Sequence, residues 1–153
     1  MMRMIAALLL ASVAFAQPAA VLSVAGPPPT VQAKIGATVE VKLPLQLRVG
    51  YHVQSNTPTD KYLIPLRLTW NQGPLEAVAV GYPKPQMEKY AFSKMPQSVF
   101  SGNFDLTTKF KVPPNAIAGP TAITGKLRYQ ACNDNMCLPP RTMDVSLQVD
   151  IVR

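Results

Sequence analysis

The chain has 153 residues, of which 48% are hydrophobic, 15% charged and 7% aromatic, and its formal net charge at pH 7 is +7. This composition supplies one apolar core and argues against an intrinsically disordered protein. The 16 prolines and 8 glycines interrupt the chain so often that a helical bundle is excluded and many short strands are expected. The cations are not interleaved with aromatic residues, so nucleic-acid binding is not expected.

The N-terminal residues 1–16 have the pattern of an export signal. Arg3 is followed by the apolar run Ile5–Phe15 and by a small-x-small pattern that ends at Ala16, before Gln17. The run is too short to span a bilayer. We therefore expect cleavage after Ala16 and an exported mature chain.

Period-two alternation of apolar and polar side chains dominates the rest of the chain and is typical of strands with one buried face. The strands predicted in chain order are residues 31–35, 38–49, 62–70, 75–80, 104–112, 123–131 and 142–151. Turn signals separate them at the spacing of a two-sheet sandwich. We predict one all-β, immunoglobulin-like domain over 31–153, preceded by an N-terminal arm or linker over 17–30.

The longest stretch without a strand signal runs from Gly81 to Gly102 and is rich in Pro, Lys and aromatic residues. Loops of that length inside a compact domain are usually functional. This segment is therefore a candidate part of the functional site.

Cys132 and Cys137, the two cysteines of the chain, flank the four residues 133–136 between two alternating segments. This spacing predicts a hairpin whose ends are close enough for a disulfide, and export permits one. As a structural link it would be weak, because closing a ring of about six residues stabilises a fold by only about 2 kcal/mol. An immunoglobulin staple would instead join distant strands beside a buried Trp.

Strand parity places Cys132 on the polar face that carries Lys126 and Arg128. Side chains on such a face are accessible to solvent. We therefore expect Cys132 to be reachable, as thiol–disulfide exchange requires.

Two parts of the sequence carry a family resemblance. The run Tyr129–Cys132, the run Cys137–Pro140, and the segments Gly50–Asn56 and Tyr62–Pro65 resemble the N-terminal periplasmic domain of the thiol:disulfide interchange protein DsbD. The resemblance implies an immunoglobulin-like fold, a periplasmic location and a redox-active disulfide that needs no cofactor. It also implies an electron-transfer component of a protein-disulfide reductase.

The resemblance further implies roles for individual residues. Cys137 is expected to form mixed disulfides with partners, and Cys132 to resolve them. A cap loop is expected at Glu88–Phe92, where either Tyr90 or Phe92 shields the cysteines. An aromatic that closes the end of the sandwich is the alternative for both. Two further tyrosines, Tyr51 and Tyr129, are expected near the redox pair. For Tyr51 the alternative is a position in the core.

The expected partners are a thioredoxin-like redox protein or domain and other periplasmic thiol–disulfide proteins. Family members continue into membrane and thioredoxin-like domains, whereas this sequence ends at Arg153. Electrons are therefore expected from another polypeptide, with a separately encoded membrane donor as a candidate.

Two other functions are also compatible with the sequence. The first is a non-catalytic interaction module with a structural disulfide, since one fold serves many functions. The second is a soft-metal site for Cu(I), with sulfur ligands from Cys132, Cys137 and Met136 and with His52 as a possible addition. His52 alone is more often a surface or hydrogen-bonded histidine.

Overall fold

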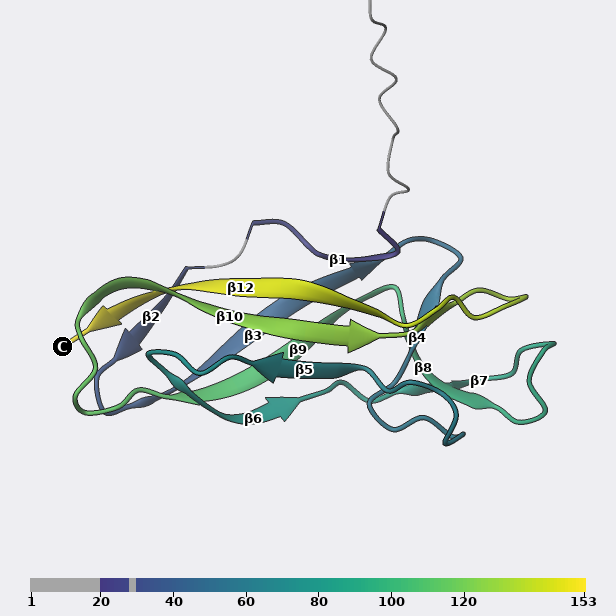
Figure 1. Cartoon of the computed structure of the whole chain (residues 1–153), viewed down its shortest axis with the longest axis horizontal. Coiled ribbons are helices and arrows are strands. Elements are labelled where there is room, and N and C mark those ends of the chain that lie inside the picture. Colours follow the sequence, from purple (N-terminus) through teal and green to yellow (C-terminus); the bar gives the residue numbers. More distant parts are fainter. Residues whose placement is uncertain (1–19, 28–29) are drawn as a thin grey trace, which may run out of the picture.

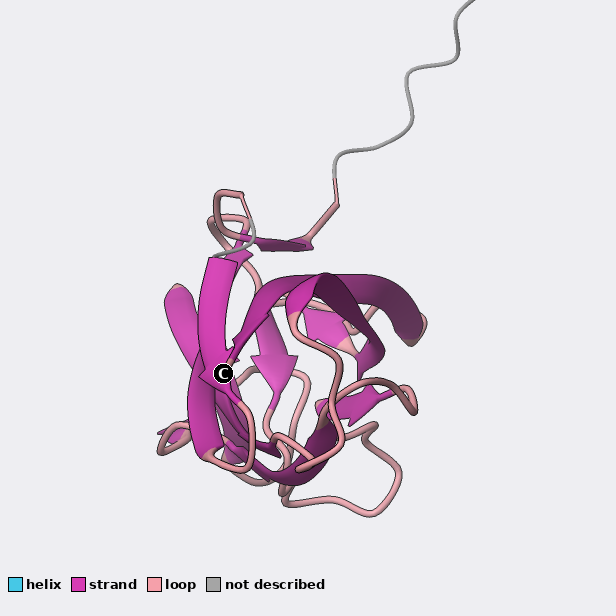
Figure 2. Ribbon diagram, turned by 90° about the vertical axis from the view of Figure 1, so that its left-hand side faces the viewer, coloured by secondary structure: helices cyan, strands magenta, loops and turns pink. Residues whose placement is uncertain are grey.

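The computed structural model describes residues 20–27 and 30–153, and this part of the chain contains strands and no helix (Figure 1). The predicted all-β sandwich is confirmed. Figure 2 shows the layers end-on. The expected export signal, residues 1–16, lies outside the described residues. Within the described residues, no helix has the length and apolar character needed to cross a membrane.

The strands form three sheets of four strands each. In chain order the strands are β1 (Leu22–Val24), β2 (Thr30–Lys34), β3 (Thr38–Leu47), β4 (His52–Gln54), β5 (Arg67–Trp70), β6 (Glu76–Gly81), β7 (Gln86–Glu88), β8 (Gln97–Ser101), β9 (Asn103–Lys111), β10 (Gly119–Tyr129), β11 (Ala131–Cys132) and β12 (Arg141–Val152). Two sheets, β1-β3-β9-β6 and β2-β12-β10-β5, extend along the molecule. The third, β11-β4-β8-β7, lies at the end away from the C-terminus (Figure 1).

The longest strands follow the predicted alternation. In β12 the side chains at Val145, Leu147, Val149 and Ile151 are buried and face the core. β12 pairs with β10 in an antiparallel register that runs from Gly119↔Ile151 to Tyr129↔Arg141. Burial of one face in each long sheet supplies the hydrophobic stabilisation of the sandwich.

Trp70 joins the two long sheets. It lies on β5, and its ring packs edge-on against Phe110 of β9, with the ring centroids 5.3 Å apart. Its indole Nε1 donates a hydrogen bond of 2.9 Å to Oγ1 of the buried Thr108. The indole therefore packs in the core while its polar N–H has a partner.

The strand predicted over 62–70 is shorter than expected and begins only at Arg67. Asp60 turns the chain before it: its Oδ1 accepts from the backbone N–H of Tyr62, and its carbonyl accepts from that of Leu63. Tyr62 is 79% exposed rather than paired on a strand. Local turn hydrogen bonds thus compete successfully with the strand that the alternation predicts.

Five short strands have no counterpart in the predicted set, because two to five residues give too little alternation to recognise: β1, β4, β7, β8 and β11. β1 falls in the segment expected as an arm, and its Leu22 is buried in the core. β7 and β8 occupy much of the segment expected as one long loop. The loop that remains between them spans residues 89–96.

Substitution of Gly125 tests the packing between β10 and β5. Gly125 lies opposite Trp70, and a Cβ atom there would be 2.8 Å from both the Thr69 carbonyl oxygen and Trp70 Cε3. We expect Gly125→Ala to lower the free energy of unfolding by about 1–3 kcal/mol through overpacking. Urea unfolding measures this, with Gly73→Ala as control, since the nearest atom there is 3.9 Å away. Equal stability of the two variants would contradict the close approach.

Candidate functional site: an asymmetric disulfide beneath an aromatic loop

Cys132 and Cys137 form a disulfide at the tip of a hairpin. Their sulfur atoms are 2.04 Å apart and their Cα atoms 3.9 Å apart. The Asn133 side chain shapes the loop between them, because its Oδ1 accepts from the backbone N–H groups of Asn135 and Met136. The backbone N–H of Asn133 donates to the Met136 carbonyl. Asn commonly forms such local turns, and the predicted four-residue loop is confirmed.

The two sulfur-bearing residues differ in exposure. Cys132 is 0% exposed, whereas Cys137 is partly exposed. The expectation that Cys132 lies on an accessible polar face is therefore wrong. β10 ends at Tyr129, and Cys132 belongs to β11, which pairs with β4 in another sheet. The alternation of β10 does not continue through this change of sheet.

Strand β4 provides polar side chains beside Cys132. His52 lies directly opposite Cys132 in the register of β4 and β11. The side-chain Nε2 of Gln54 donates to Gln97 Oε1 at 2.8 Å and lies 3.6 Å from Cys132 Sγ. Gln54 and Gln97 are buried, and Gln54 Oε1 has no hydrogen-bond partner. Gln54 cannot be recognised as a site residue from the sequence, since a glutamine within the segment Gly50–Asn56 carries no distinctive signal.

His52 is buried, with 3% of its surface exposed, and is neither a surface residue nor fully hydrogen-bonded. Its Nε2 has no partner. Its ring stacks on Tyr90, with the centroids 4.1 Å apart and the planes 10° from parallel. Desolvation lowers the pKa of His52 below its ordinary value of 6.5, and the negative charge of Asp134 opposes this shift in part.

The expected cap loop lies over this end of the sheet. Tyr90 stacks on His52 and also on Phe92, whose ring centroid is 5.6 Å away. Internal bonds hold the loop: Lys89 Nζ donates to the Lys94 carbonyl, and the backbone N–H of Ser93 donates to the Tyr90 carbonyl. Burial, aided by Glu88 and Asp134, raises the pKa of Tyr90 to about 12. The hydroxyl therefore stays neutral at physiological pH.

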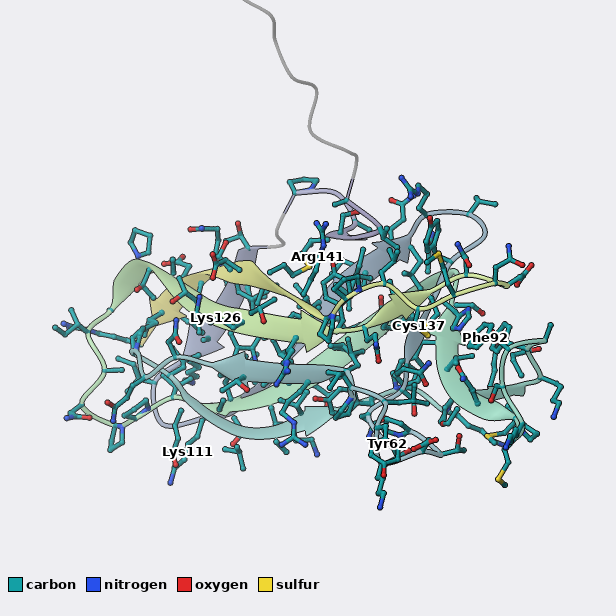
Figure 3. The ribbon with its side chains drawn as sticks, turned by 45° about the vertical axis from the view of Figure 1, so that its right-hand side comes forward. Tyr62, Phe92, Lys111, Lys126, Cys137 and Arg141 are labelled. Carbon is teal, nitrogen blue, oxygen red and sulfur yellow. A yellow bond between two sulfur atoms is a disulfide. The ribbon has the colours of Figure 1, made fainter. Side chains whose placement is uncertain are left out.

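A groove leads to the partly exposed sulfur-bearing residue. It has a volume of about 800 Å³ and lies between the residues around Asp60 and the loop that carries Phe92. Figure 3 shows Phe92 and Cys137 near one another at this end of the molecule. The residues that line the groove are Thr59, Asp60, Lys61, Leu63, Phe92, Ser93, Lys94, Met95, Gln97 and Cys137. Cys132 is not among them, so the groove gives access to one half of the disulfide.

Tyr51 and Tyr129 lie beside the hairpin but line a different cavity, of about 200 Å³, together with Arg48 and Arg141. The guanidinium of Arg48 lies 4.7 Å from the centre of the Tyr51 ring. Burial raises the pKa of Tyr129, while the nearby Arg141 lowers it in part. The structure thus separates these two tyrosines from Tyr90 and Phe92.

The metal alternative gains no support from this geometry. Within the described residues, no three or more His, Cys, Asp or Glu side chains are grouped so as to hold a metal ion. The two cysteine sulfurs that would have to bind Cu(I) are bonded to each other. Met136 is exposed at the loop tip, while His52 is buried.

Two crystal structures share the fold. The N-terminal periplasmic domain of ScsB from Proteus mirabilis is 18% identical over 76% of this chain and 43% of that chain, with a TM-score of 0.52. The reduced N-terminal domain of DsbD from Neisseria meningitidis is 15% identical over 76% of this chain and 82% of that chain, with a TM-score of 0.50. At these identities the likeness establishes the fold alone.

The sequence itself carries the family signal. No curated protein matches the chain. The family model described as "Thiol:disulfide interchange protein DsbD, N-terminal" matches residues 24–149. That match includes both cysteines, strand β4 and the cap loop, and it confirms the resemblance seen in the sequence. The chain belongs to the family of DsbD N-terminal domains.

Proposed function

We propose that this domain carries out thiol–disulfide exchange in the periplasm, with Cys137 as the sulfur that bonds to partners and Cys132 as the sulfur that resolves the intermediate. The observation that carries the proposal is the unequal exposure of the two cysteines. Exchange proceeds by attack of a thiolate on an accessible sulfur. Only Cys137 lies in the groove.

Each step conserves atoms and electrons. A partner thiolate attacks Cys137 Sγ, a bond forms between the partner and Cys137, and the Cys132–Cys137 bond breaks with its electron pair on Cys132. A second partner thiol then releases Cys137, so the partner is oxidised and the pair reduced. In the opposite direction, the Cys137 thiolate attacks an oxidised partner, and Cys132 displaces that partner in its reduced form.

The expected electron source is a thioredoxin-like redox protein or domain, and the expected recipients are oxidised periplasmic proteins. The chain spans less than half of the ScsB chain it resembles. A membrane-bound electron donor is our candidate for the upstream step. The related Neisseria domain is described in its reduced form. This supports a pair that opens without loss of the fold.

The cap is proposed to limit access to the disulfide. Phe92 is the better candidate for the shielding side chain, because it lines the groove that leads to Cys137, the sulfur that partners attack. Tyr90 stacks on both Phe92 and His52 and supports Phe92 from the inner side. Displacement of Phe92 would widen the access to Cys137.

The Cys132→Ser variant tests the exchange function. We expect it to accumulate mixed disulfides through Cys137 when mixed with a periplasmic extract, since the resolving sulfur is gone. Non-reducing electrophoresis and mass spectrometry identify the linked chains. Cys137→Ser is the matched control and should trap few partners, because Cys132 is buried. Absence of trapped partners in both variants would leave an interaction module with a structural disulfide.

Substitution of the cap aromatics tests the shielding role. We expect Phe92→Ala to speed reduction of the disulfide by dithiothreitol roughly two- to tenfold, because an aromatic pair contributes about 0.5–1.5 kcal/mol. Tyr90→Ala should have a smaller effect. Tyr62→Ala, which removes another exposed aromatic (Figure 3), should leave the rate unchanged. A larger effect for Tyr90 than for Phe92 would reverse the assignment.

The buried imidazole of His52 predicts a pH dependence of stability. The pKa of His52 in the folded chain lies below its ordinary value of 6.5. At a pH between the folded and unfolded pKa values, the unfolded chain therefore binds more protons than the folded chain. The contribution of neutral His52 to the free energy of unfolding is thus complete above pH 6.5 and is lost as the pH falls through the folded-state pKa. Urea unfolding at about pH 7.5 and about pH 5 should show a smaller loss for His52→Phe, which keeps a stacking ring but does not titrate. An equal loss in both proteins would exclude His52 as the cause.

A further inference from the structure

Gln54 lies beside the disulfide, and the exchange steps given above do not use it. We propose that Gln54 is a positioning residue for the reaction: its side-chain N–H holds the Cys132 sulfur and stabilises the thiolate that forms there when the bridge opens. This inference rests on the proposed exchange function. It is carried by the contact between Gln54 Nε2 and Cys132 Sγ, at 3.6 Å, and by the complete burial of both residues.

The orientation of the amide follows from the chemistry of its neighbours. A disulfide sulfur has no proton, so it can only accept a hydrogen bond. Gln97 also presents an acceptor, its Oε1, at 2.8 Å. The two hydrogens of the Gln54 amide thus meet two acceptors, whereas the reversed amide would place its oxygen against both.

The backbone fixes this side chain from two sides. Gln54 pairs with Val99 of β8, and its backbone N–H donates to the Gln130 carbonyl at 3.2 Å. Gln97, which accepts from its amide, lies on the same strand as Val99. The donor is therefore held in place before the reaction begins, as positioning of charge stabilisation requires.

The donor matters because Cys132 is sealed from water. When a partner attacks Cys137, the electron pair of the broken bond stays on Cys132 Sγ, and a buried thiolate without a partner is costly. A hydrogen bond to an anion is stronger than one to a neutral group. The low dielectric constant of the protein interior strengthens it further. The N–H of Gln54 thus favours the thiolate over the disulfide and over the neutral thiol.

The unpartnered Oε1 of Gln54 extends the argument to the reduced protein. It is a buried acceptor that lacks a donor while the disulfide is closed. The S–H of a protonated Cys132 is a donor that the disulfide does not offer. A half-turn of the Gln54 and Gln97 amides together presents Gln54 Oε1 to that donor and keeps a hydrogen bond between the two side chains. One amide group therefore serves this sulfur both as thiolate and as thiol.

The first experiment measures the thiol pKa of Cys132 in a Cys137→Ser background, by the ultraviolet absorbance of the thiolate. We expect Gln54→Leu to raise that pKa by about one unit or more, a change of roughly tenfold in the ionisation constant. In the protein with both cysteines, the same substitution should slow reduction by dithiothreitol roughly tenfold. Unchanged values in both assays would overturn the proposal.

Ser98→Ala is the matched control. It removes a buried hydrogen bond between the Ser98 and Ser55 hydroxyls, whose oxygens are 2.7 Å apart. Ser98 is the neighbour of Gln97 in the chain, and its hydroxyl bonds to Ser55 and not to a cysteine sulfur. We expect it to leave the Cys132 pKa and the reduction rate unchanged. A shift equal to that of Gln54→Leu would show that general loosening of this sheet, and not the donor, is responsible.

A second measurement needs no change at Gln54 and covers the case in which Gln54→Leu does not fold. In the Cys137→Ser protein, the NMR signals of the Gln54 side-chain amide should shift with pH along the titration curve of Cys132. Signals that do not follow that curve would overturn the proposal. Failure of the exchange function is separate, since it shows as the absence of trapped partners in the Cys132→Ser protein.

Discussion

The pairing of β11 with β4 determines the character of the site. It takes Cys132 out of the long sheet in which β10 lies and buries it against His52 and Gln54. Cys137, only five positions later, returns toward the surface and lines a groove. A single short strand pairing therefore produces a disulfide with one sealed and one approachable end.

Polar groups gather around the sealed end in an unusual way. Buried polar side-chain atoms without a hydrogen-bond partner are uncommon in folded proteins. Within the described residues two such atoms occur, His52 Nε2 and Gln54 Oε1, and both belong to β4. Their desolvation costs free energy in the closed form of the site. Such costs are characteristic of functional sites, where local stability is exchanged for chemistry.

The sequence predicted the parts of this structure that rest on long alternation. The sandwich, the pairing partners β10 and β12, and the hairpin loop of the cysteines all follow from period-two patterns or from turn chemistry. The buried state of Cys132 did not follow, because it depends on a two-residue strand in a different sheet. Nor did the role of Gln54, which depends on contacts with residues 43 and 78 positions away.

The placement of the site at one end of the sandwich separates its chemistry from the stability of the fold. The contacts of Trp70 with Phe110 and Thr108 link the two long sheets, whereas the disulfide closes only a short hairpin. In the chain-entropy model a ring of that size contributes about 2 kcal/mol, so opening it removes little of the free energy of folding. The hairpin keeps its ends together through the hydrogen bonds from Asn133 to Met136 and from Leu138 to Ala131. Because these backbone bonds do not depend on the sulfurs, the bridge is able to open while the strands that position it remain paired.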